Sequence, residues 1–198
     1  VNGRAIMSPV FMGSEPNDAD IGKYKGTRVF HDEEHLGLVL AQSLSMEQRS
    51  KAVIGDELPP EVFTTAFRDN FELKYEGIRF NDLSSSQQGL MLNVIDTYVG
   101  RMRQDQASLK MDEVKEHLGE TYFAWMGAAT EKDVYYYRIH SPVILIEFDY
   151  QRGVALDTDK PTKDHIHTVV RTPNGNDYGK DLLRQHRENA DASHGHRS

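Results

Sequence analysis

The fold is decided by Val143-Ile144-Leu145-Ile146-Glu147-Phe148-Asp149-Tyr150 and, after a polar loop, by His165-Ile166-His167-Thr168-Val169-Val170-Arg171. Both segments are rich in β-branched and aromatic residues, which favour strands. Two similar segments, 122–126 and 134–140, come before them, and Gly127 and Ser141-Pro142 mark the turns between strands. Such a run of neighbouring strands predicts a mostly antiparallel sheet in this half of the chain.

The preceding half has the apolar spacing of helices. After Asp32, apolar residues recur on one helical face, and Ser45-Met46-Glu47-Gln48 has the form of a capping box that opens a short helix ending near Ile54. The strongest helical pattern follows Ser84 and runs to Met102. Further helices are predicted over 106–118, with Gly119 as the cap, and over 178–188. The sequence therefore predicts an α+β fold, with a helical N-terminal half packed on a mostly antiparallel sheet and a C-terminal helix.

The length of 198 residues suits one sizeable domain. We expect this α+β domain to span 1–188 and the small polar residues 189–198 to form a disordered tail. The chain begins at Val1, inside a predicted N-terminal strand over 4–12. This start suggests a piece of a longer or processed protein, and no signal peptide is visible in it.

Composition restricts the classes of function. The net charge is −8, from 23 basic and 31 acidic residues, and no basic stripe is present that could neutralise phosphates, so we expect no nucleic-acid partner. The longest apolar stretch, Val143 to Ile146, is too short to span a membrane. With no cysteine, any metal must be held by His, Asp, Glu or backbone oxygen. The absence of cysteine also leaves the compartment open, a secreted or periplasmic one included.

His165 and His167 are the main candidates for chemistry. Residues i and i+2 of a strand project from the same face, so the two imidazoles are expected to lie side by side. This spacing suits two ligands of one divalent ion such as Zn or Fe. The alternative is a half-exposed strand with its polar residues outward.

Glu147 and Asp149 share one face of the most apolar strand, where a carboxylate needs a cation or hydrogen-bond donors. If this strand lies next to 165–171, Glu147 would complete a site of two His and one carboxylate. An ion pair of Glu147 with Arg171 or Arg138 across the sheet is the alternative. His186 is another candidate third ligand, if the Asn-Gly turn folds the last helix back across the His pair.

The segment 172–179 joins the last strand to the last helix. Its Asn-Gly and Asn-Asp pairs favour tight turns, and Asp177 is a suitable helix N-cap. A helix N-terminus presents free N–H groups to anions, so Arg171 would orient an anionic substrate, with Asp177 and Tyr178 shaping the mouth of the site. The sequence contains no Gly-x-Gly-x-x-Gly, Walker loop, Gly-x-Ser-x-Gly or His-Glu-x-x-His motif, which argues against nucleotide-binding folds, α/β-hydrolases and common zinc proteases.

Several of these stretches together resemble a known family. Tyr136 to Asp149, His165 to Arg171 and Asn176 to His186, with Phe11 to Pro16 and Gly26 to Val29, are similar to the family called domain of unknown function 3500. The resemblance covers nearly the whole chain up to His186 and suggests the C-terminal portion of longer members. It implies a missing N-terminal segment with a paired-His motif of its own. Relatives often have His at position 150 and an aromatic residue at 187, so the resemblance places Tyr150 outside the ligand set.

The sequence thus leads to two hypotheses. The first is a metal-dependent enzyme acting on a small molecule, with His165 and His167 as ligands and Glu147 or His186 as the third. Zn would support hydrolysis through a bound hydroxide, and Fe(II) would support oxygen chemistry. The second is a non-catalytic ligand-binding or structural domain, in which the His pair and Arg171 form a polar network.

Overall fold

A computed structural model of the chain describes residues 5–65, 67–181, 183–184 and 186–187. The strands are β1 (Val10–Ser14), β2 (Val53–Gly55), β3 (Ile78–Arg79), β4 (Tyr122–Gly127), β5 (Tyr135–His140), β6 (Leu145–Arg152) and β7 (Pro161–Arg171). The α-helices are α1 (His31–Ser43), α2 (Met46–Ala52), α3 (Ser85–Val99) and α4 (Gln104–Glu116). Short 3₁₀ turns cover Gly22–Tyr24, Phe80–Asp82, Leu118–Glu120 and Asp177–Gly179.

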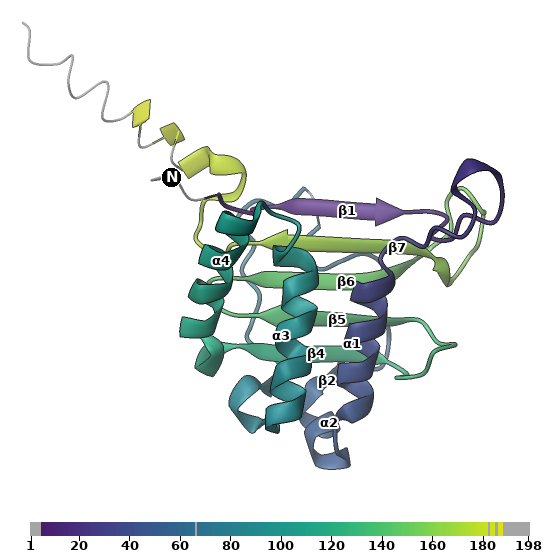
Figure 1. Ribbon diagram of the computed structural model, residues 1–198, viewed down its shortest axis with the longest axis horizontal. Coiled ribbons are helices and arrows are strands. Elements are labelled where there is room, and N and C mark those ends of the chain that lie inside the picture. The colour runs from purple at the N-terminus through teal and green to yellow at the C-terminus, as the bar shows by residue number, and fades with distance from the viewer. Residues whose placement is uncertain (1–4, 66, 182, 185, 188–198) are drawn as a thin grey trace, which may run out of the picture.

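All the strands belong to one seven-stranded sheet in the order β1-β7-β6-β5-β4-β2, and β3 pairs with β4 beside this path. Every pairing is antiparallel except that of β2 with β4. Helices α1, α3 and α4 lie over one face of the sheet (Figure 1). The predicted α+β class with a mostly antiparallel sheet is confirmed, and the strand with the His pair does lie next to the strand with Glu147.

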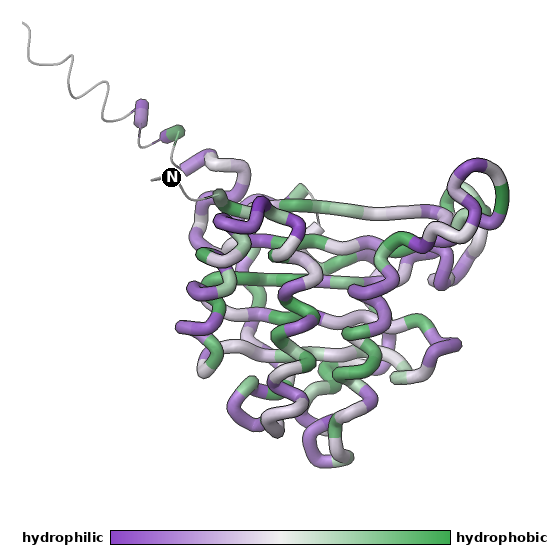
Figure 2. The backbone as a smooth tube through the Cα atoms, viewed as in Figure 1, coloured by the Kyte–Doolittle hydropathy of each residue, from purple (hydrophilic) through white to green (hydrophobic). Residues whose placement is uncertain are grey.

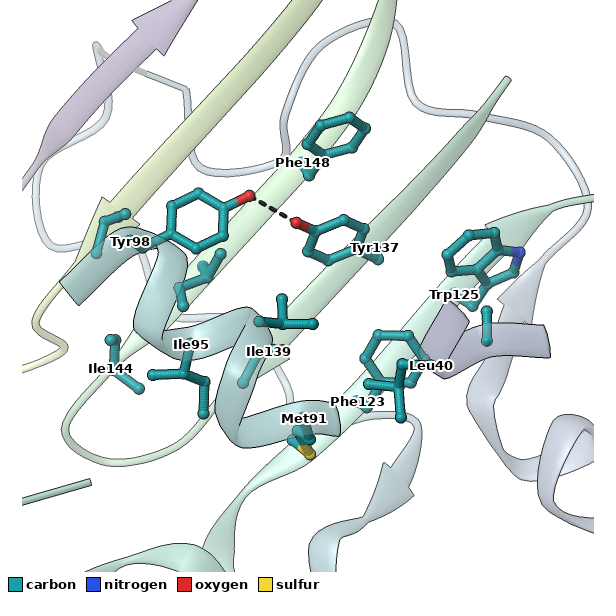
Figure 3. Packing of buried hydrophobic residues seen from close by; sticks show 14 of the residues in the cluster. Leu40, Met91, Ile95, Tyr98, Phe123, Trp125, Tyr137, Ile139, Ile144 and Phe148 are labelled. Atoms are coloured by element: carbon teal, nitrogen blue, oxygen red, sulfur yellow. Dashed lines mark hydrogen bonds between the residues drawn. The ribbon is translucent and has the colours of Figure 1, made fainter. Parts of the chain in front are cut away.

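Local sequence explains where the helices start. Ser45 and Gln48 form the predicted capping box of α2, and Ser84 and Gln87 form another at the start of α3. The apolar faces of α1 and α3 then pack on the sheet, as Leu40, Met91 and Ile95 do in Figure 3. Tyr98 of α3 and Tyr137 of β5 are fully buried, and their hydroxyls lie 2.6 Å apart. Figure 2 shows hydrophilic residues in the loops and along the helices, α4 among them.

The opposite face of the sheet is polar although it is buried. We call it the polar face: it carries Tyr136, Arg138, His140, Glu147, Asp149, His165, His167 and Arg171. An irregular segment, residues 56–77, crosses this face, and we call it the strap. Buried sheet side chains hold the strap by its backbone: Glu147 accepts from the amides of Phe63 and Thr64, and Arg138 donates to the carbonyl of Lys74. The strap is therefore tied to the sheet by charged groups.

Two local predictions were wrong. Helix α4 ends at Glu116 with His117 as its C-cap, so Gly119 is not the cap but part of a 3₁₀ turn. Asp177 is not an N-cap, because the side chain of Asp177 turns toward Arg171 and Ser8. A 3₁₀ turn with Tyr178 in the left-handed conformation (φ 58°) comes first, and residues 180–181, 183–184 and 186–187 are helical, as predicted for 178–188. The predicted tail, 189–198, lies outside the described residues, and within the described part no helix has the length and apolarity to cross a membrane.

Candidate metal centre

His165 and His167 lie side by side on the polar face, as the strand spacing predicts. Their Nε2 atoms are 3.0 Å apart, and the ring planes are perpendicular. Nδ1 of His165 lies 2.7 Å from the backbone oxygen of Arg152 on the neighbouring strand β6. Nδ1 of His167 lies 2.8 Å from Oε1 of Glu61 on the strap. Each imidazole is therefore held through Nδ1, and the two Nε2 atoms face each other.

These contacts determine where the ring protons are. A backbone carbonyl and a carboxylate only accept hydrogen bonds, so Nδ1 of both rings must carry the proton. In a neutral imidazole the other nitrogen then has a bare lone pair. Two lone pairs directed at each other across 3.0 Å repel unless a cation lies between them. The arrangement thus calls for either a shared proton or a metal ion.

The carboxylate of Glu61 is ionised in this setting. Burial alone would raise the pKa of Glu61, but the hydrogen bond and the charge attraction from His167, helped by the Val62 amide, lower it below the ordinary value. An ionised Glu61 accepts from His167 and cannot donate to it, which keeps the proton on Nδ1. Glu61 was not a predicted site residue.

Asp149 is the nearest carboxylate on the sheet itself. It pairs directly with His167 in the β6–β7 register and is fully buried. Gln151 donates to one carboxylate oxygen, and Oδ1 has no hydrogen-bond partner among the described residues. Burial, together with the charges of Glu61 and Glu147, raises the pKa of Asp149 well above its ordinary value. Ligand atoms of Glu61, Asp149 and His167 all lie within 4.8 Å of one another, so two carboxylates lie close to the His167 imidazole.

Glu147 is bound by hydrogen-bond donors on the strap and on β5. Its Oε1 accepts from the Phe63 amide and the Tyr136 hydroxyl, both at 2.8 Å. Its Oε2 accepts from the amide and the hydroxyl of Thr64, at 3.0 and 2.5 Å. Four donors thus satisfy this buried carboxylate, and within the described residues it forms no ion pair with Arg138 or Arg171. Glu147 anchors the strap.

Arg171 and Asp177 form a buried ion pair at the carboxyl end of β7. Arg171 also donates to the backbone oxygens of Thr64 and Thr65, and Asp177 accepts from the amide of Asn70. Arg171 and Asp177 therefore both bind the backbone of the strap. Tyr178 and His186 are exposed. Both come after the end of β7, whereas the His pair lies in the middle of that strand (Figure 1). The structure does not bring His186 to the His pair.

The neighbouring strand β1 makes room for the ring of His167. Gly13 pairs with His167, and a Cβ at position 13 would lie 2.8 Å from Cδ2 of that ring. The Phe11 ring packs on the edge of the same imidazole at 5.0 Å between centroids. Position 150 lies on the other face of β6, where the Tyr150 hydroxyl binds Glu34, in keeping with its exclusion from the ligand set.

Comparison with known proteins places the chain in a family. No curated protein and no solved structure matches it. The model of one family, described as "Protein of unknown function (DUF3500)", matches residues 1–180, which is most of the chain. The chain therefore belongs to the DUF3500 family.

Proposed function

We propose that this protein is a metal-dependent enzyme whose divalent ion is bound by Nε2 of His165, Nε2 of His167 and the carboxylate of Asp149. The observation that carries the proposal is the pair of Nε2 atoms that face each other at 3.0 Å, while an acceptor holds Nδ1 of each ring. Two imidazole nitrogens that bind one zinc ion at ~2.0–2.1 Å lie roughly 3 Å apart. The His pair therefore already has the spacing of two ligands.

The groups around the pair support the same interpretation. Metal-binding histidines commonly donate their second N–H to a backbone carbonyl or a carboxylate, which fixes the tautomer and the ring orientation. The Arg152 carbonyl and Glu61 stand in these two positions. Asp149 supplies a buried carboxylate with an unpaired oxygen, and a cation would offset the cost of keeping it ionised. Asp149 thus takes the place that the sequence suggested for Glu147.

Three protein ligands leave a coordination position for water or substrate, which is the mark of a catalytic site. The approach is from the strap side, because the side chains of His167 and Glu61 are 18% and 36% exposed while that of His165 is 10% exposed. Two His and one carboxylate suit Zn, which generates hydroxide for hydrolysis, and Fe(II), which supports oxygen chemistry. We propose a small-molecule substrate in either case.

A second candidate function is a non-catalytic domain in which the two imidazoles share a proton. The low exposure of His165 and Asp149 favours it, since a closed polar network needs no access for substrate. The two candidates differ in one property. The first needs a bound ion, and the second does not.

Metal content separates them. Protein purified without chelator is analysed by elemental mass spectrometry, and a parallel sample is titrated anaerobically with Zn²⁺ and Fe²⁺. We expect one tightly bound ion per chain, lost in the double variant His165→Ala/His167→Ala. The matched control is His31→Ala/His35→Ala, which removes a second His pair, a stacked one on the exposed face of α1. A protein that holds no ion as purified and shows no saturable uptake overturns the proposal, and the identity of the ion directs the choice of assay.

A further inference from the structure

A cavity of about 290 Å³ lies at the β2 edge of the sheet, on the face that the helices cover. Residues of α1, α2, β2, β4 and the loop after β4 surround it, and Figure 1 shows these elements together at one end of the molecule. Trp125 of β4 points to this face, because it pairs with Tyr137, whose hydroxyl meets Tyr98 of α3. The cavity is therefore on the opposite face of the sheet from the proposed metal centre, and three strands away from β7.

The cavity has an apolar floor and a rim that is open to solvent. The floor consists of buried residues, namely Ala41, Leu44, Ala52 and Trp125. The rim consists of half-buried or exposed residues, namely Arg49, Val53, Gly127, Ala128, Ala129 and Thr130. The Nε1–H of Trp125 already donates to the backbone oxygen of Gly127 at 2.8 Å, so the indole needs no polar partner in the cavity. A ligand that enters over the rim therefore meets a surface that favours hydrocarbon.

Arg49 carries the charge at the rim. It lies on α2 and is exposed, and its side chain makes no hydrogen bond or ion pair with any residue that the structure describes. No Asp or Glu is among the described residues that line the cavity. The other polar side chain of the rim, Thr130, donates its hydroxyl hydrogen to Asp133. The guanidinium of Arg49 is thus an accessible cation beside an apolar cavity, with its donors available to a ligand.

This combination indicates the chemistry of the ligand. A guanidinium donates two parallel hydrogen bonds to a carboxylate, which is the partner that its geometry matches best. A phosphate monoester carries a charge of ~−2 at neutral pH and would need a second cation, which the described lining does not supply. A monoanion with an apolar body therefore fits both the floor and the rim.

The volume limits the length of the apolar body. An apolar cavity of ~150 Å³ holds one benzene molecule. At about 290 Å³ the cavity has nearly twice that volume, which suits a chain of roughly eight carbon atoms. We propose that the cavity binds a medium-chain monocarboxylate, with the hydrocarbon chain beside Trp125 and the carboxylate on Arg49.

Trp125 provides a direct readout, because it is the single tryptophan of the chain. Bromine quenches indole fluorescence at short range, so 8-bromooctanoate is the probe, and octanoate, 1-octanol and octyl phosphate compete with it. The full chain is titrated with chelator present, which makes the result independent of the proposed metal centre. We expect saturable quenching that octanoate reverses, and binding of 1-octanol that is roughly tenfold weaker, since the alcohol lacks the charged contact.

Two variants test the two parts of the cavity. Arg49→Gln removes the charge, and we expect a roughly tenfold weaker Kd for octanoate with little change for 1-octanol. Lys51→Gln is the matched control, because it removes a positive charge from the same helix outside the cavity, and it should bind as the wild type does. Ala129 packs against the core from the rim, so Ala129→Phe fills the cavity and should abolish the binding of both compounds.

Circular dichroism and thermal melts check that each variant is folded. The proposal is overturned if the wild type shows no saturable quenching, or if 1-octanol or octyl phosphate binds as tightly as octanoate. It is also overturned if folded Arg49→Gln and Ala129→Phe bind octanoate as the wild type does. The variant His165→Ala/His167→Ala should bind octanoate normally, so loss of the metal would not affect this result.

Discussion

Glu61 and His167 are 106 positions apart in the chain, and a 2.8 Å hydrogen bond joins them. Glu61 belongs to the strap, and His167 belongs to the middle of β7. The bond therefore makes the strap part of the proposed metal centre. It also fixes the proton of His167 on Nδ1, which leaves Nε2 free to bind an ion.

The first prediction concerns this bond. Glu61→Gln should weaken metal binding by ~10–100-fold, because an amide supports the His167 ring less well than a carboxylate does. The dissociation constant is measured by competition with a chelator of known affinity. Glu57→Gln, an exposed change on the same strap, is the control and should have no effect. Complete loss of the ion in Glu61→Gln would instead make Glu61 a direct ligand.

A second prediction concerns Gly13, which lies against the His167 ring. In Gly13→Ala the new Cβ would lie 2.8 Å from Cδ2 and 3.4 Å from Nε2 of His167, so the ring must move. We expect weaker metal binding and a loss of about 1–3 kcal/mol of unfolding free energy, the usual cost of overpacking. Chelator competition and denaturant unfolding measure the two effects.

Gly89→Ala is the control for Gly13→Ala. A Cβ at position 89, in the interior of α3, has no atom within 4 Å. It should leave metal binding unchanged and stabilise the helix by up to ~1 kcal/mol. Equal metal affinity in Gly13→Ala and Gly89→Ala would show that the His167 ring position does not matter for binding.

A third prediction concerns Glu147 as the anchor of the strap. Glu147→Gln keeps the shape of the side chain but turns one acceptor oxygen into a donor that meets the N–H and O–H donors of Thr64 or Tyr136. We expect a loss of ~2–4 kcal/mol of unfolding free energy. Faster proteolytic cleavage within 56–77 should accompany it. If Glu147→Gln is as stable as the wild type, the strap is held by its other contacts.

The fourth prediction concerns acid stability through His140. Burial and the Arg138 charge lower the pKa of His140 to about 4, against an ordinary value of 6.5. Folding thus favours the neutral form of His140. This contribution to the unfolding free energy is complete above pH 6.5 and is lost as the pH falls toward 4. The difference between the two pKa values corresponds to about 3 kcal/mol of unfolding free energy.

The variant His140→Phe should therefore lose less stability than the wild type between pH 6.5 and 4, while the two should show parallel curves above pH 7. The other charged groups near His140, namely Arg171, Asp177 and Glu72, which line one cavity with it, remain in the variant. Urea unfolding at fixed ionic strength with chelator present measures the effect. Parallel curves over the whole range would mean that His140 is not held neutral by the fold.

Much of the architecture follows from local sequence. The Ser45–Gln48 capping box and the apolar periodicity after Ser84 predict α2 and α3, because helix starts and helix faces depend on residues three and four positions apart. The strands β4 to β7 follow from β-branched and aromatic runs with turns between them. The shared face of His165 and His167 follows from the two-residue period of a strand alone.

The choice between Glu147 and Asp149 was beyond the sequence. Both carboxylates project from one face of β6, so strand periodicity cannot tell them apart. The register pairs Asp149 with His167 and Glu147 with Val169, and the strap supplies the donors that occupy Glu147. The strap donors lie more than 80 positions away from Glu147 in the chain, and the register depends on how the two strands pair in the folded sheet.

Sequence by itself determined which residues form helices and strands and which side chains share a face, because these properties depend on near neighbours. Tertiary structure alone decided that Glu61 reaches His167, that Asp177 turns to Arg171 rather than capping a helix, and that Arg49 and Trp125 line one cavity. The strap has no periodic pattern to predict its path. Its position depends on buried charges of the sheet that bind its backbone, and those partners meet only in the folded chain.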